Sequence, residues 1–303
     1  GGDVGHVEQL GQAAQVPAAG HLGHDALGLG HERHRAERRA GEVEGGVREG
    51  QALGAGLHTV GPATGTDVRR DRLTYPGGVT SVVVRTGSGD VSVLPAAGGE
   101  LTVDRRRAGA VHVPDVRARR DGGRVTLDGD CAFFFDGPFL RCSVSYVLRV
   151  PPGVSVDVET RSGRVDVAGV DGEVTADTGS GAITATGVRA ERVSLTTGSG
   201  GITLDDVGGE EAEVRTGSGT VTGTGLRVAA LVARTGSGGI TAGFREAPTS
   251  VEATTGSGAV SVTVPPGDAY DVELGTGSGK QQLGVITSPE ATRTIRLSTG
   301  SGG

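Results

Sequence analysis

The chain has 303 residues and a formal net charge of −7 that is spread along its length, and 57 of its residues are glycine. Because each glycine weakens a helix by about 1 kcal/mol relative to alanine, this composition favours strands and turns. No basic cluster forms a nucleic-acid-binding face, and no run of about 18 apolar residues provides a transmembrane helix.

Residues 1–72 differ from the rest of the chain in composition. Their apolar residues follow neither the period of a helix nor that of a strand. We therefore expect a low-complexity segment that is disordered, or spurious translation upstream of the genuine start. Metal binding is disfavoured, because no cysteine or ordered carboxylate cluster accompanies the histidines of this segment, His6, His21, His24, His31, His34 and His58.

Residues 73–153 show strand patterns at irregular spacing. Val82, Val84, Thr86, Val91 and Val93 repeat once the spacing of a strand with one buried face. Phe133–Phe135 and Phe139 also lie in this part. We expect these rings to plug the first coil of the following repeat as an N-terminal cap, which repeat proteins need. A binding pocket built on them is the alternative.

The same part holds Cys131 and Cys142, the two cysteines of the chain. Their spacing suits a loop-closing disulfide in an exported protein. A metal site would need more ligands, and a redox pair would normally be Cys-x-x-Cys. The sequence favours the disulfide over two buried free thiols.

Residues 154–303 contain an internal repeat. The motif Thr-Gly-Ser-Gly, or once Thr-Arg-Ser-Gly, recurs with spacings of 18 to 23 residues from Thr160 onward. Two residues and four residues before each of these threonines the chain is always apolar, and the positions between are mostly polar. An apolar residue also follows each motif by five positions, except at Gln281. The motif threonines are Thr86, Thr160, Thr178, Thr197, Thr216, Thr235, Thr255, Thr276 and Thr299.

Each repeat therefore predicts two short strands joined at a Gly-Ser-Gly corner. Stacking the repeats as coils of about 19 residues would join their apolar columns into one core. This predicts an all-β fold with a single stacked β-solenoid. A sandwich of tandem hairpins is the competing architecture, because glycine-containing loops also make hairpins. The corner threonines lie in phase with the buried columns, so we expect their hydroxyls to bond to corner backbone or to a neighbouring coil.

These features together resemble the DUF4097 family of bacterial β-strand-repeat proteins, which carry the label "putative adhesin". The resemblance covers roughly residues 75–303 and rests on corners such as Thr178-Gly-Ser-Gly-Ala-Ile183 and on the strand Val150–Val158. Actinobacterial members with an Asp-Cys…Cys-Ser-Val insertion look like Asp130-Cys131 and Cys142-Ser143-Val144. The resemblance implies export or membrane tethering and a role at the cell envelope, and it implies no enzymatic activity.

The sequence contains no convincing set of catalytic or metal-binding residues. We expect Asp166, Asp205-Asp206 and Glu210-Glu211 to be solvated, since they do not align with Arg or Lys in neighbouring coils. A calcium-binding β-roll would need an aspartate in each turn, and no Ser/His/Asp set is arguable. Threonine pairs such as Thr184 and Thr186 suggest a water-ordering ladder, but we expect that ladder not to be sustained across coils.

The sequence thus predicts a non-catalytic structural or interaction module of the cell envelope, or an extracellular one, with no cofactor and no metal. Its partner would be an envelope protein or glycan, with a membrane tether if the genuine N-terminus carries an anchor. Self-association through an open C-terminal coil is a further expectation. The alternatives are a carbohydrate-binding or polysaccharide-active protein on the same scaffold, and a cytoplasmic scaffold with free thiols.

Overall fold

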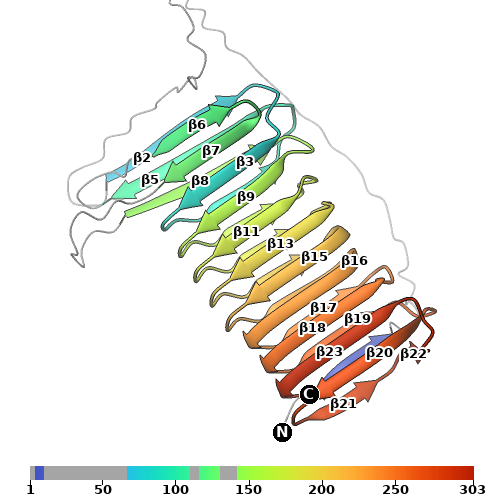
Figure 1. The fold of residues 1–303 in the computed structure, drawn as a ribbon. Coiled ribbons are helices and arrows are strands. Elements are labelled where there is room, and N and C mark those ends of the chain that lie inside the picture. The colour runs from blue at the N-terminus through green and yellow to red at the C-terminus, as the bar shows by residue number, and fades with distance from the viewer. Residues whose placement is uncertain (1–3, 10–66, 110–115, 130–141) are drawn as a thin grey trace, which may run out of the picture. The chain divides into compact units, whose positions relative to one another are not determined.

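The computed structural model describes residues 4–9, 67–109, 116–129 and 142–303, and every regular element in these stretches is a strand. The repeats form coils of two strands each, one in sheet A and one in sheet B (Figure 1). Pairing between successive coils is parallel, as in Val156↔Val174 and Val174↔Val193. Parallel pairing confirms the predicted solenoid and shows that the hairpin sandwich is wrong, because hairpins pair antiparallel.

Sheet A consists of strands that follow the corners, together with strands from residues 4–9 and 67–150. In spatial order its strands are β2 (Asp67–Tyr75), β5 (Leu101–Gly109), β8 (Cys142–Val150), β4 (Val91–Pro95), β10 (Val165–Ala168), β12 (Ile183–Thr186), β14 (Ile202–Asp205), the first part of β16 (Val221–Ser237), β17 (Ile240–Phe244), β19 (Val260–Val264), β1 (Val4–Gln9) and β21 (Lys280–Leu283).

Sheet B consists mainly of strands that lead into the corners. In spatial order its strands are β6 (Arg117–Asp121), β7 (Arg124–Gly129), β3 (Ser81–Thr86), β9 (Ser155–Thr160), β11 (Val174–Thr178), β13 (Arg192–Thr197), β15 (Gly208–Thr216), the second part of β16, β18 (Ser250–Ser257), β23 (Thr294–Ser301) and β20 (Ala269–Thr276). The short strand β22 (Ile286–Thr287) pairs with β20.

The core lies between the two sheets and is built from the apolar columns. Along β11 the burial alternates strictly, with Val174, Ala176 and Thr178 buried and the residues between them exposed. The same alternation recurs in β9 and β13. One buried valine stabilises the fold by about 1.5–3 kcal/mol, and stacking provides such residues in every coil. The fold therefore depends on the stack as a whole.

The first coils are extended by antiparallel strands. In sheet A, β5 lies between β2 and β8, and in sheet B, β6 pairs with β7 (Figure 1). After β1, which lies within residues 1–72, strand structure resumes at Asp67, six residues before the boundary expected at residue 73. Asp71 of β2 is largely buried and accepts a hydrogen bond of 2.9 Å from Nε of Arg105. Arg105 is only 9% exposed, so this ion pair is shielded from solvent.

The order of the last strands departs from the order of the chain. β23 lies between β18 and β20, with Ile295 aligned with Val251 on one side and Val272 on the other. The coil of β20 and β21 is thereby displaced outward by one strand. Simple stacking in chain order, which would leave the last strand at the end, does not hold here.

Candidate functional site

The corner threonines point into the coil stack and their hydroxyls are used in bonding. Thr197 Oγ1 donates to the carbonyl of Gly181 in the preceding coil at 2.8 Å, and it accepts from the amide of Gly200 in its own corner at 3.1 Å. The same pair of bonds recurs at Thr178 and Thr216. Eight of the nine are buried, and Thr276 is half-buried. The corner threonines are therefore structural, and their hydroxyls are not presented to solvent.

The outer face of sheet A carries a column of hydroxyl groups. Thr184 aligns with Thr203, then with Thr222 and Thr241, in four successive coils. Ser261 follows in the next strand. The expectation that the threonine ladder would not be sustained is wrong, because the register joins threonines that lie about one repeat apart. Successive hydroxyls in this column are about 4.8 Å apart.

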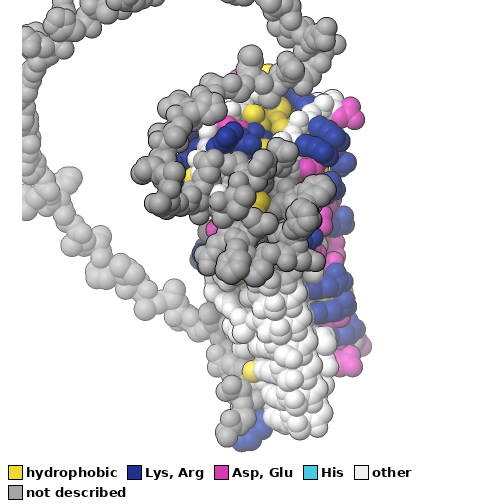
Figure 2. Space-filling view, turned by 90° about the vertical axis from the view of Figure 1, so that its left-hand side faces the viewer, with side chains coloured by type: hydrophobic (Ala, Val, Ile, Leu, Met, Phe, Trp, Pro, Cys, Tyr) yellow, Lys and Arg dark blue, Asp and Glu magenta, His cyan; other side chains and the backbone are white. Residues whose placement is uncertain are grey.

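The outer face of sheet B is charged, and its charges are paired between coils. Arg192 Nε lies 3.1 Å from Glu211 Oε2, and Arg234 Nη2 lies 2.7 Å from Glu252 Oε1. Glu211 was expected to lack a basic partner, but the register places it directly beside Arg192. Figure 2 shows that charged side chains gather along one flank, whereas the lower part of the face turned to the viewer, where no grey atoms cover it, is almost free of them.

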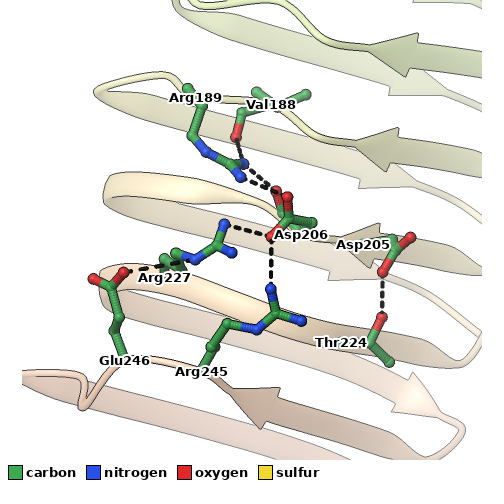
Figure 3. Close-up of polar contacts among 8 residues, drawn as sticks. All are labelled: Val188, Arg189, Asp205, Asp206, Thr224, Arg227, Arg245 and Glu246. Atoms are coloured by element: carbon green, nitrogen blue, oxygen red, sulfur yellow. Dashed lines mark hydrogen bonds and ion pairs between the residues drawn. The ribbon is translucent and has the colours of Figure 1, made fainter. Parts of the chain in front are cut away.

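The densest polar cluster of the described residues surrounds Asp206, on the edge opposite the corners (Figure 3). Asp206 Oδ2 lies 2.5 Å from Arg189 Nη2 in the preceding coil, and Oδ1 lies 2.5 Å from Arg227 Nη1 in the following coil. Arg245, one coil further, is 3.9 Å from Oδ1. The hydrogen bond from Arg189 holds the pKa of Asp206 below its usual range. One carboxylate thus joins arginines from three other coils.

The expectation that Asp206 is merely solvated is wrong, and the reason is a diagonal contact. Arg189 and Arg227 stand two positions further along their coils than Asp206 does in its own, so a comparison of equivalent positions misses them. Asp206 also has a φ of 53°, whereas the equivalent residues are glycines with similar φ, Gly169, Gly187 and Gly225. Aspartate tolerates this left-handed backbone better than most residues, but glycine adopts it without strain. Asp205 accepts a hydrogen bond from Thr224 instead.

Replacing Asp206 by glycine is therefore expected to change the melting temperature little, since relief of the backbone offsets the loss of exposed ion pairs. Raising the salt concentration should lower the melting temperature of the natural chain relative to that of the variant, because salt screens the ion pairs and does not affect the backbone strain. The folded-state pKa of Asp206 is lowered, so the stability it contributes is present above its ordinary pKa of 3.8 and is lost as the pH falls through the folded value. Thermal unfolding at several salt concentrations and pH values measures both effects.

The control variant is Asp206→Asn. It keeps the strained backbone and loses the charge, so it should be less stable than the natural chain. A variant Asp206→Gly that is strongly destabilised in high salt would contradict this account.

A second polar feature is an open pocket of about 530 Å³ on the outer side of sheet B, near the first corners. Glu159 and Asp177 stand side by side there on adjacent strands, and Arg85 Nε lies 3.4 Å from Glu159. Burial raises the pKa of Asp177, and the neighbouring Glu159 raises it further. A carboxyl group with a raised pKa beside a carboxylate is the arrangement that a general acid would need.

Several predicted features lie outside the described residues. Cys131, Phe133–Phe135 and Phe139 fall in residues 130–141, so the disulfide to Cys142 and the aromatic plug stay predictions. Within the described residues no group of three or more His, Cys, Asp or Glu side chains is placed to hold a metal ion. No helix in the same residues is long and apolar enough to cross a membrane.

Comparison with known proteins gives one family match. A family model described as Toastrack DUF4097 matches residues 79–302. No curated protein matches the sequence. Among solved structures, a putative adhesin from Bacteroides fragilis is 13% identical, with 80% of this chain and 100% of that chain covered and a TM-score of 0.45. A putative adhesin from Parabacteroides distasonis is 12% identical, with 76% and 97% covered and a TM-score of 0.38. A putative cell adhesion protein from Clostridium sporogenes is 9% identical, with 78% and 96% covered and a TM-score of 0.32.

Proposed function

Because the chain belongs to the Toastrack DUF4097 family, we propose that it is a non-catalytic interaction module of the bacterial cell envelope, or of the space outside it. It would bind through its repetitive outer faces. The single observation that carries this proposal is the in-register column of Thr184, Thr203, Thr222 and Thr241 on sheet A.

The column suits a neutral, repetitive partner rich in hydroxyl groups, such as an envelope glycan. Each threonine hydroxyl both donates and accepts a hydrogen bond. Each contact alone is weak. Contacts repeated about every 4.8 Å along one polymer bind more tightly together, because after the first contact the others form at a high effective concentration. Sheet B suits such a partner less well, because its outer face is charged and carries ion pairs such as Arg192 with Glu211 and Arg234 with Glu252.

The test is binding of the purified chain to isolated envelope glycans. The triple variant Thr203→Lys, Thr222→Lys, Thr241→Lys should lower binding at least about ten-fold, because it places three charges on the proposed face. The matched control Thr175→Lys, Ser194→Lys, Thr254→Lys adds the same charge to the outer face of sheet B and should bind as the natural chain does. Loss of binding only in the control would contradict the assignment to sheet A.

The polysaccharide-active alternative is favoured by one observation, the raised pKa of Asp177 beside Glu159 in the open pocket. The same glycan preparations separate the two functions. Glycan cleavage that Asp177→Asn abolishes would establish an enzyme and contradict the non-catalytic proposal. Binding without cleavage supports the interaction module.

Localisation is tested by a non-reducing tryptic digest of envelope and cytosolic fractions from the source cells. Trypsin cuts after Arg141, so a Cys131–Cys142 disulfide would join peptide 125–141 to peptide 142–149. A linked pair in the envelope fraction supports the proposal. Separate thiol peptides found only in the cytosol would contradict it.

A further inference from the structure

The position of β23 in sheet B leaves room for one additional strand in sheet A. β23 adds one strand to sheet B between β18 and β20. The two coils that flank it send β19 and β21 into sheet A. Since neighbouring strands are about 4.8 Å apart in both sheets, β19 and β21 are separated by a slot of one strand's width.

β1 fills this slot, and it is the blue strand among the orange and red ones in Figure 1. It pairs in parallel on both sides, with His6 aligned with Ser261 of β19 and with Gln282 of β21. The connection from β1 to the next described strand is long, since β2 begins at Asp67. The other sheet A strands of the repeat are supplied by the coil to which they belong, whereas β1 is supplied from the opposite end of the sequence.

The register of β1 leaves the core incomplete at one position. Along sheet A, the column from Val165 through Ile183, Ile202, Val221 and Ile240 to Val260 is buried and β-branched throughout. In the slot this column falls on Gly5, which aligns with Gln281 on the far side. A pocket of about 20 Å³ lies there, lined by Val260, Leu274, Gln281 and Leu297 among others. That volume holds about one water molecule.

We propose that the slot between β19 and β21 is an acceptor site for an extended peptide strand, and that β1 is a replaceable occupant of it. The fitting ligand pairs in parallel and has a β-branched apolar residue opposite Val260, then a polar residue, then an apolar residue. The chain's own strands show this pattern, as in Ile202-Thr203-Leu204. Main-chain hydrogen bonds to both edges provide affinity, and the pocket beside Val260 provides specificity. The site is distinct from the outer faces, and its test does not depend on the proposed function.

The probe is a fluorescently labelled peptide with the sequence of residues 200–206, Gly-Gly-Ile-Thr-Leu-Asp-Asp. Its binding to the full chain is measured by fluorescence anisotropy. The matched control peptide has glycine in place of the isoleucine and should bind about ten-fold more weakly or worse, because it leaves the pocket empty as Gly5 does. Equal binding of the two peptides would overturn the proposed specificity.

Full-chain variants test the role of β1. Val7→Pro removes a backbone donor from the middle of β1 and should increase peptide binding, because proline is not tolerated between two paired strands. Gly5→Val should reduce peptide binding by improving the resident strand. The control His6→Val changes the residue aligned with the outward Ser261 and should leave binding unchanged. Failure of the peptide to bind the Val7→Pro chain would overturn the acceptor site. Equal binding to all four chains would overturn the assignment of β1 as its occupant.

Discussion

Replacing Gly200 by alanine is expected to destabilise the folded chain by about 3 kcal/mol, the upper end of the range for overpacking. A Cβ at this position would lie 1.8 Å from the carbonyl oxygen of Gly181 and 2.5 Å from its carbonyl carbon. Both atoms belong to the backbone of the preceding coil, so neither can move aside without separating the coils. The φ of Gly200 is not left-handed, and the expected effect is therefore purely one of space.

The adjacent residue provides the control. A Cβ on Gly201 would meet no atom closer than 3.5 Å, the carbonyl oxygen of Thr220. Gly201→Ala should therefore be neutral or slightly stabilising, since alanine restricts the unfolded chain. Urea unfolding of the two variants measures the difference in the free energy of unfolding. Equal stabilities would show that the coils are not in the close contact described here.

Replacing Thr197 by valine is expected to lower the free energy of unfolding by about 2 kcal/mol or more. Valine has the same shape as threonine, so the change removes the hydroxyl without opening a cavity. The carbonyl of Gly181 and the amide of Gly200 both lose a partner in a part-buried corner. Each buried polar group left without a partner costs about 1–3 kcal/mol.

Thr196 is the matched position, because it lies next to Thr197 on β13 but on the outer face, and its side chain makes no hydrogen bond to any residue that the structure describes. Thr196→Val should change stability by less than about 0.5 kcal/mol. Thermal and urea unfolding, run side by side on both variants, provide the measurement. A Thr197→Val chain as stable as Thr196→Val would mean that the corner hydroxyls contribute nothing.

Much of the fold could be predicted from the sequence because its information is local and periodic. The apolar columns fix which residues face inward, and the regular motif spacing fixes which residues align between coils. The pairing of Val174 with Val193 and of Thr178 with Thr197 follows from those two facts alone. The resemblance to the family, stated on the corner motifs, is confirmed by the match over residues 79–302.

The position of β23 could not be predicted in this way. Main-chain hydrogen bonds between strands do not depend on which side chains the strands carry. The inward residues of β23, Ile295 and Leu297, also resemble Val272 and Leu274 of β20. Either strand fits beside β18. The available signals were the polar Gln281 in an otherwise apolar column and the longer spacings between the last motifs.

The Asp206 cluster was missed for a different reason. Comparison of equivalent positions finds contacts between residues directly abreast, whereas Arg189 and Arg227 reach Asp206 diagonally with long side chains. A signal was nevertheless present. Asp206 stands alone where the neighbouring coils have Gly169, Gly187 and Gly225, and a single departure from a glycine column marks a residue with a particular use.

The placement of β23 also has a consequence for synthesis and folding. From β9 and β10 up to β18 and β19 the solenoid can grow in the order in which the ribosome delivers it, each new coil pairing with the last. β20 then emerges before β23, and its Val272 and Leu274 match the columns of β18 well enough to pair there first. Reaching the final arrangement would then require β20 to leave β18 and let β23 enter between them. We would expect this exchange to be the slow terminal step of refolding, set by the release of a whole strand rather than by the nucleation of a coil.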